Sequence, residues 1–229
     1  MNNVRRILIG LIVLAMSAPG LAADANKQQN LVDQARITLD SFLADPNMPW
    51  FRDHVKDAHG LLIVPQMLKA AFFFGGSGGS GVLLVRDEKT GDWSQPAFYT
   101  VGSASFGLQF GGQASELVLM VTTRKGIEPL YTTTLKLGID ASVAVGPVGT
   151  RVEGATPLNL SADYLSFARS KGAFVGFSLE GAVVASREKW NNAYYGQEVR
   201  PVQILVEGEV TNPQSAGLRA TAARATKAP

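Results

Sequence analysis

Seven consecutive positions, residues 75–81, have the sequence GGSGGSG, with five glycines and two serines. Apolar segments rich in Phe, Val and Leu flank them on both sides. Because glycine lacks a Cβ atom, it lets a backbone turn sharply or approach another backbone or a ligand closely. Such a run can cradle a phosphate group or shape a sheet, and the residues that follow it distinguish the two.

The run formally matches the dinucleotide-binding pattern G-x-G-x-x-G at Gly76, Gly78 and Gly81. That pattern binds a pyrophosphate only when a helix begins directly after the glycines. Here Val-Leu-Leu-Val follows at 82–85, which is typical of a strand. The Lys-Ser/Thr pair that ends a Walker loop is also missing. We therefore predict no nucleotide cofactor.

The run also matches the nucleophile pattern G-x-S-x-G, with Ser77 at its centre. A nucleophile elbow needs a following helix and a histidine later in the chain. The two histidines, His54 and His59, both precede Ser77. We therefore predict no catalytic residue here. We interpret the glycines as structural, in a hairpin or a bulged strand crossing, where they let a sheet bend or pack closely: Gly75, Gly76, Gly78, Gly79 and Gly81.

Other chemistry-bearing residues form no clear constellation. Two histidines and no cysteine cannot make a typical structural zinc site, so we predict no metal. Two of the acidic residues that flank or interrupt apolar strands could form an acid/base pair. The alternative, charge-assisted hydrogen bonds to backbone or arginine, leads us to expect no enzyme. These acidic residues are Glu116, Asp140, Asp163 and Glu180.

Residues 1–22 have the layout of a secretory signal peptide. Arg5 and Arg6 precede an apolar run over 7–16, and small residues up to Ala22 and Ala23 follow it, the order found in a cleaved export signal. The run is shorter than the roughly 20 residues that a spanning helix needs. We expect cleavage after Ala22 or Ala23 and a periplasmic location, with possible peripheral attachment to a membrane.

Removing that peptide would make the chain neutral. The sequence has 21 basic and 19 acidic residues, and Arg5 and Arg6 leave without an acidic residue, which gives 19 of each. A neutral protein offers no electrostatic reason to bind nucleic acid. The tail at 211–229 is basic, and we expect it to be partly helical or disordered, either solvated or in weak contact with an anion. Its cations are Arg219, Arg224 and Lys227.

We expect one domain over 23–210 that begins with two helices. Over 27–43, apolar residues recur at three- and four-residue steps, the period of an amphipathic helix. This stripe contains Leu31, Ala35, Leu39 and Phe42. A second helix is expected to begin near Trp50 and to end before Gly60, with Phe51 and His54 on its apolar side.

Beyond Gly60 the period changes to two. We predict strands over 61–64, 71–74, 82–85, 117–121, 141–145 and 173–183, an alternating segment at 105–110, and helices over 124–133, 186–193 and part of the tail. Glycines within strands permit strong coiling. The predicted fold is α+β: a strongly coiled antiparallel β-sheet or barrel, Gly-rich, flanked by N-terminal amphipathic helices and short C-terminal helices.

Six segments in order resemble the SYLF domain family and cover nearly all of the chain after the export signal. They are GLLIVPQMLKA (60–70), FFFGGSGGSGVLLVRD (72–87), TGDWSQPAFYTVGSASFGLQFGGQASELVLMV (90–121), KLGIDASVAVGPVG (136–149), DYLSFARSKGAFVGFSLEGAVV (163–184) and NNAYYG (191–196). The layout resembles bacterial members, in which an export signal precedes one SYLF domain. Eukaryotic members bind phosphoinositide-containing membranes, and some bind actin.

The resemblance implies lipid binding through an N-terminal amphipathic segment and basic residues. On this sequence those positions are Lys27, Leu31, Arg36, Leu39, Phe42, Trp50 and Phe51. Asp33 and Asp40 balance the two cations, so the helix lacks the Lys/Arg excess of a strong anionic-lipid site. Apolar insertion or an acyl-chain groove therefore fits this chain better than phosphoinositide specificity.

The leading hypothesis is a non-enzymatic protein of the bacterial cell envelope whose partner is a phospholipid or membrane surface, without a cofactor. Export would remove the reason to expect actin. The second hypothesis is an envelope protein–protein interaction or scaffolding module. The third, an enzyme acting on a lipid or glycan, would require the acidic residues named above.

Overall fold

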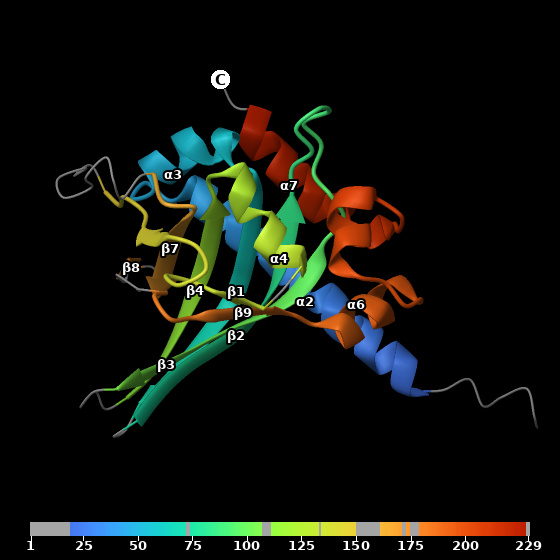
Figure 1. Cartoon of the computed structure of the whole chain (residues 1–229), viewed down its shortest axis with the longest axis horizontal. Helices are drawn as coiled ribbons and strands as arrows, with labels where there is room; N and C mark the ends of the chain where they lie inside the picture. Colours follow the sequence, from blue (N-terminus) through green and yellow to red (C-terminus); the bar gives the residue numbers. More distant parts are fainter. Residues whose placement is uncertain are drawn as a thin grey trace, which may run out of the picture.

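The computed structural model describes residues 19–71, 74–106, 111–132, 134–149, 161–170, 173–174 and 179–227. It confirms the α+β prediction, because a strongly curled sheet carries helices from both ends of the chain (Figure 1). Eight strands follow the order β5-β9-β3-β2-β1-β4-β7-β6, and β8 pairs with β7. The pairs are antiparallel apart from β6–β7, which is parallel.

The strands differ greatly in length, with four long strands at the centre. These are β1 (Gly60–Ala71), β2 (Phe74–Val85), β3 (Ala97–Phe106) and β4 (Gly111–Val121). The other strands are β5 (Leu135–Lys136), β6 (Val143–Val145), β7 (Tyr164–Ser170), β8 (Ala173–Phe174) and β9 (Val183–Ser186).

Most of the helices cover the outer, convex side of the sheet or one of its ends, and one short helix that contains Leu130 lies against the concave side (Figure 1). The α-helices are α2 (Pro19–Ala44), α3 (Pro49–His54), α4 (Glu128–Thr132), α6 (Glu188–Tyr195) and α7 (Ala216–Lys227). Short turns of 3₁₀ or π type are η2 (Val55–Asp57), η3 (Arg124–Gly126), η4 (Gln203–Glu207) and η5 (Pro213–Ser215). No described helix has both the length and the apolar character that a bilayer crossing requires.

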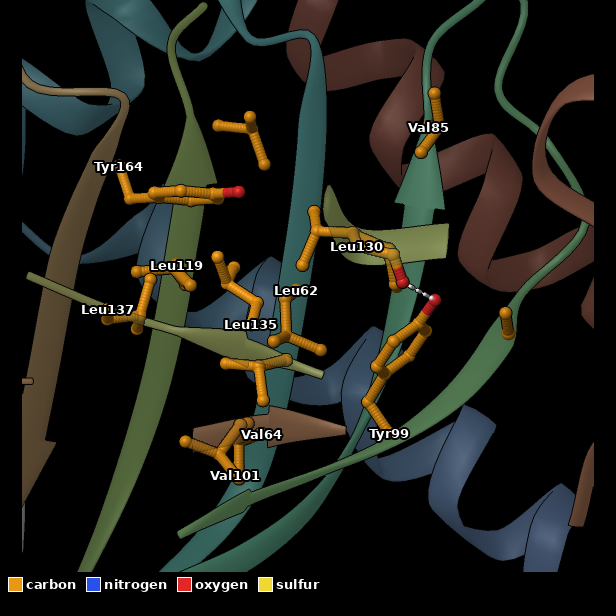
Figure 2. Close-up of a cluster of buried hydrophobic side chains, with 14 of the residues drawn as sticks. Leu62, Val64, Val85, Tyr99, Val101, Leu119, Leu130, Leu135, Leu137 and Tyr164 are labelled. Atoms are coloured by element: carbon orange, nitrogen blue, oxygen red, sulfur yellow. Dashed lines mark hydrogen bonds between the residues drawn. The ribbon is translucent and has the colours of Figure 1, made fainter. Parts of the chain in front are cut away.

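Two clusters of buried side chains lie on the two faces of the sheet. The concave face encloses one, shown in Figure 2, in which Tyr99 donates a 2.5 Å hydrogen bond to the carbonyl of Leu130. The outer face packs against α2, α3, α6 and α7, with Phe42 and Phe98 among its largest residues. Strand residues of alternating parity supply the two clusters, as the pleat of a strand requires.

The glycine run lies inside β2, so of the two predicted alternatives, a hairpin and a bulged strand crossing, the hairpin is wrong. Gly78 pairs with Leu68 of β1 on one side and with Gly102 of β3 on the other. The irregularity is in β1, where the register shifts between Ile63 and Gln66 against β2. Pro65 sits in this bulge, because a residue without an N–H group cannot complete a central ladder.

Two further predictions need correction. The expected strand over 173–183 is interrupted, because the chain turns at Leu179–Ala182 with Gly181 at φ 76°; β8 and β9 pair with different strands as a result. The C-terminal tail is helical over Ala216–Lys227, in agreement with the predicted partly helical alternative, but it is not simply solvated. Leu218 and Ala222 of α7 are buried against the outer face. The alternating residues Leu108 and Phe110 and the first eighteen residues of the predicted signal peptide lie outside the described residues.

Candidate functional site

The half of the four central strands that lies farther from the covering helices is almost free of charged residues. Residues 70–85 and 94–115 contain no Asp, Glu, Lys, Arg or His, and in this half Lys69 of β1 is the one charged residue. These strands extend beyond the helices that cover the rest of the sheet (Figure 1). An extension of a sheet that carries so little charge is a candidate binding surface.

One row of residues crosses this half on the outer, helix-covered face of the sheet. Register pairs join its members from strand to strand, and we call it the apolar row: Ala114 of β4, Leu68 of β1, Gly78 of β2, Gly102 of β3 and Val183 of β9. Leu68 is 54% exposed and Val183 is 36% exposed. At about 4.8 Å between strands, the row is about 19 Å wide.

The glycines of this row have open space above them. A Cβ atom built on Gly78 would have the carbonyl oxygen of Val101 as its nearest neighbour, at 3.8 Å, and one on Gly102 would have that of Ser77, also at 3.8 Å. Gly76, further along β2 on the same face, is similarly open. The outer face therefore presents bare backbone between the projecting side chains of Leu68 and Val183.

Gly79 and Gly81 face the other side and are tightly packed. A Cβ on Gly79 would lie 2.4 Å from the carbonyl oxygen of Gln66, and one on Gly81 would lie 2.6 Å from that of Ile63. Both contacts involve the backbone next to the bulge at Pro65. Close approach thus accounts for these two glycines, but not for Gly76 and Gly78. Gly75 pairs with Ala71 and Ser105 in the ladder.

A groove of about 330 Å³ adjoins the apolar row between α2 and the sheet. Ala114 belongs to both, and Ile37 of α2, 57% exposed, stands over the groove. The β1 bulge supplies the opposite wall with Pro65 and Gln66. The groove thus connects the apolar row to the first helix, and its lining is mixed: Ile37, Pro65 and Ala114 are apolar, whereas Gln34, Thr38, Gln66, Ser115 and Glu116 are polar or charged.

A charged cluster closes one end of this groove. Arg169 of β7 donates hydrogen bonds to Glu116 (2.5 Å), Asp45 (3.0 Å) and Ser41 (2.5 Å), and Thr38 donates to the other oxygen of Glu116 at 3.2 Å. Burial opposes the charge of Arg169, but its bonds to Glu116 and Asp45 raise its pKa above the ordinary value. The cluster ties α2 to β4 and β7.

The structure places the predicted lipid-binding residues in different environments. Leu39, Phe42 and Phe51 are fully buried against the sheet. Leu31 and Trp50 are partly buried beside them, Lys27 is exposed, and Arg36 pairs with Asp40 at 3.5 Å. The amphipathic stripe of α2 therefore contacts its own sheet in this conformation, and a direct contact of these residues with lipid stays a prediction.

The acidic residues that could have formed a catalytic pair have structural partners. Asp163 accepts from Thr123 and Ser142, each at 2.7 Å. Burial would raise the pKa of Asp163, but these hydrogen bonds and Lys125 hold it below its ordinary value. Asp140 accepts from the backbone of Lys136. Within the described residues, no group of three or more His, Asp or Glu side chains could hold a metal ion.

Sequence reasoning missed Ile37, Leu68 and Val183. Ile37 lies off the apolar stripe of its helix, and an isolated surface apolar residue carries no signal by itself. Leu68 follows the bulge, so a simple alternation counted from Leu62 places it on the opposite, concave face. Residues two apart on β2, such as Gly76 and Gly78, share a face. This spacing was the one sequence signal that one face of β2 lacks side chains.

Comparisons with known proteins agree with the sequence resemblance. A family model described as Ysc84, Las17-binding protein actin regulator, matches residues 102–225. SH3 domain-containing YSC84-like protein 1 of Bos taurus is 34% identical over 163 residues, which are 71% of this chain and 47% of that protein. The Homo sapiens protein of that name is 33% identical over 163 residues, with the same shares of both chains.

LAS seventeen-binding protein 3 of Saccharomyces cerevisiae is 33% identical over 175 residues, which are 75% of this chain and 37% of that protein. The chain therefore spans less than half the length of these relatives. The family model nevertheless covers more than half of the chain, including the apolar-row residues Gly102, Ala114 and Val183. The chain belongs to the Ysc84 family, the SYLF-domain family that its six sequence segments resemble.

Proposed function

We propose that this protein is a non-enzymatic lipid-binding protein whose apolar row contacts the membrane. The observation that carries the proposal is the exposure of Leu68 (54%) and Val183 (36%) on an extension of the sheet with so little charge. Charged side chains are costly within a bilayer, and none of the five residues of the row is charged; the charged residues Glu116 and Arg187 lie at its borders. Ile37, which stands over the adjoining groove, adds one more exposed apolar side chain.

A membrane is a better occupant of this surface than the protein's own helices. The apolar side of α2 is already buried against the sheet, so the row is left open beyond it. Burial of exposed apolar area stabilises binding by about 25 cal/mol per Å². The few exposed side chains here would give weak, reversible attachment, which suits a peripheral protein.

Co-sedimentation with vesicles tests the proposal. Phosphatidylglycerol/phosphatidylethanolamine vesicles should bring down the wild-type protein, and Leu68→Ser with Ile37→Ser should reduce the bound fraction several-fold while leaving the thermal midpoint unchanged. Ile139→Ser is the matched control, since Ile139 is 74% exposed but lies in the turn after β5. Folded wild-type protein that binds no vesicle composition would refute the function.

We further propose export to the periplasm, on the basis of the signal-like order of residues 1–22. Expression of the full chain in a bacterium, followed by osmotic release of the periplasm, should recover a shortened protein. Its N-terminal sequence should begin near Asp24. Full-length protein confined to the cytoplasmic fraction would contradict this proposal and would leave the lipid-binding surface to be judged separately.

The second candidate function is binding of a protein partner. The family description refers to an actin regulator and to Las17 binding, and a yeast relative is named for binding Las17. Co-sedimentation of this chain with actin filaments, without lipid, would support that function here. If the chain stays in the supernatant at micromolar actin while it still binds vesicles, actin is excluded as the partner and lipid binding is favoured.

A further inference from the structure

Arg187 lies where β9 leads into α6, beside the apolar row. Its guanidinium carbon is 3.4 Å from the centre of the Trp190 ring, and its Nη1 donates a 2.5 Å hydrogen bond to Ser80. Ser80 is two residues from Gly78 on β2 and therefore shares its face. Stacking and hydrogen bonding together fix the cation at the border of the row.

This cation has no acidic partner among the described residues, whose ion pairs all involve other side chains. Ser80 accepts the one side-chain hydrogen bond that Arg187 makes within that set, and a guanidinium has five N–H donors. Burial lowers the pKa of Arg187, although arginine stays protonated at neutral pH. A partly desolvated cation with remaining donors suits an anion.

The surroundings of Arg187 indicate which anion. Thr100 of β3 pairs with Ser80 in register and is exposed, so two hydroxyl groups lie on adjacent strands. Beyond them along the same two strands come Gly78 and Gly102, the open part of the apolar row. A hydroxyl-lined cation next to bare, uncharged backbone matches a molecule with an anionic head and an apolar tail.

We infer that Arg187, with Ser80 and Thr100, binds the phosphate group of a phospholipid whose acyl chain lies over Gly78 and Gly102. The inference rests on the proposed lipid-binding function and assigns its headgroup site. Leu68 and Val183 flank the two glycines on either side, so the chain lies between two exposed apolar side chains. The phosphate lies toward α6, and the acyl chain lies toward the free end of the sheet.

Titration with a soluble short-chain phospholipid, dihexanoyl phosphatidylglycerol, tests the headgroup contact by calorimetry and by the change in tryptophan emission, to which Trp190 contributes. Arg187→Gln should weaken binding about tenfold to a hundredfold, as expected for loss of a charge-assisted hydrogen bond. Arg187→Lys should lie in between, since it keeps the charge but loses the planar stack. Arg124→Gln removes an exposed cation elsewhere (82% exposed side chain) and should change nothing.

Gly102→Leu tests the acyl-chain contact. Because the position is open, the variant should fold normally, and its side chain should occupy the space over the glycines. Binding of dihexanoyl phosphatidylglycerol should fall at least tenfold, while inorganic phosphate should bind as weakly as it does to the wild type. If Arg187→Gln fails to fold, the weaker lipid binding expected of Ser80→Ala and Gly102→Leu still tests the inference, and unchanged binding by both would overturn it.

The outcomes separate this inference from the proposed function. If inorganic phosphate binds as tightly as the lipid and Gly102→Leu leaves lipid binding unchanged, the site binds free phosphate and the inference is overturned. Unchanged lipid binding by Arg187→Gln would also overturn it, while the Leu68→Ser result on vesicles would leave the function standing. A change in tryptophan emission on addition of poly-glutamate, but not on addition of lipid, would identify an acidic protein as the partner and overturn the inference. Wild-type protein that binds neither vesicles nor short-chain lipid would refute both.

Discussion

Both faces of the glycine-rich part of β2 contain glycine, but the glycines have different structural consequences on the two faces. On the concave face, Gly79 and Gly81 let β1 approach so closely that a Cβ atom would lie within 2.4–2.6 Å of its carbonyl oxygens. On the outer face, Gly76 and Gly78 have nothing but neighbouring backbone near them, at 3.5–3.8 Å. One set removes a clash, and the other leaves a surface bare.

The difference shows that a glycine-rich strand is not one kind of structure. Where glycines meet backbone, they are required for folding, and selection acts on stability. Where they meet open space, the fold does not require them, and a binding role becomes the better explanation. The same distinction between covered and open sides applies to α2, whose inner side includes Phe42 and whose outer side includes Ile37.

The largest expected contrast is on α2. Phe42→Ala should lower the free energy of unfolding by about 3–5 kcal/mol, because a fully buried aromatic side chain leaves a cavity. Ile37→Ala should change it by less than about 0.5 kcal/mol, as is usual for an exposed position. Urea denaturation followed by circular dichroism measures both. Similar losses for the two variants would mean that the two sides of α2 are not distinct.

The glycine contrast itself should be smaller. Gly79→Ala should cost about 1–3 kcal/mol, the usual range for overpacking, since its Cβ would meet the backbone of Gln66. Gly78→Ala should be neutral within about 0.5 kcal/mol. Thermal unfolding of the pair under identical conditions is sufficient. Equal destabilisation would remove the argument that the outer face is open.

The smallest expected effect concerns acid. The lowered pKa of Asp163 means that its carboxylate form is favoured in the folded state, so its contribution to stability is present above the unfolded pKa of about 3.9 and is lost as the pH falls through the lower folded value. Asp163→Asn should therefore flatten the stability profile below about pH 4. Asp53→Asn, at an exposed side chain, serves as the control and should leave the profile unchanged.

The sequence predicted those elements whose periodicity records burial on one side. The stripe through Leu39 and Phe42 predicts α2, and the apolar run at 117–121 predicts the inner half of β4. The glycine-rich half of β2 was not predicted as a strand, because residues without side chains show no alternation of apolar and polar character. The turn at Gly181 was not predicted either, since the sequence does not distinguish a glycine with positive φ from a glycine in a strand.

The candidate site was less accessible for a related reason. An apolar stripe that packs against the protein's own sheet and one that packs against a membrane follow the same period, so Leu39 and Phe42 fit either partner. The apolar row, by contrast, takes one residue from each of five strands, and its members extend from Leu68 to Val183 in the sequence. Arg187 reaches Ser80 over a separation of 107 residues, which no local pattern records.

The bulge at Pro65 also constrains the order in which this chain can change. The carbonyl groups that would clash with a side chain at Gly79 or Gly81 belong to Gln66 and Ile63, the residues on either side of the bulge. Deleting Pro65 would restore a regular ladder and keep the later residues on their present faces. The cost of Gly79→Ala should then shrink, so the two changes should be non-additive. A lineage that lost the proline first could lose these glycines afterwards, whereas the reverse order passes through a destabilised protein.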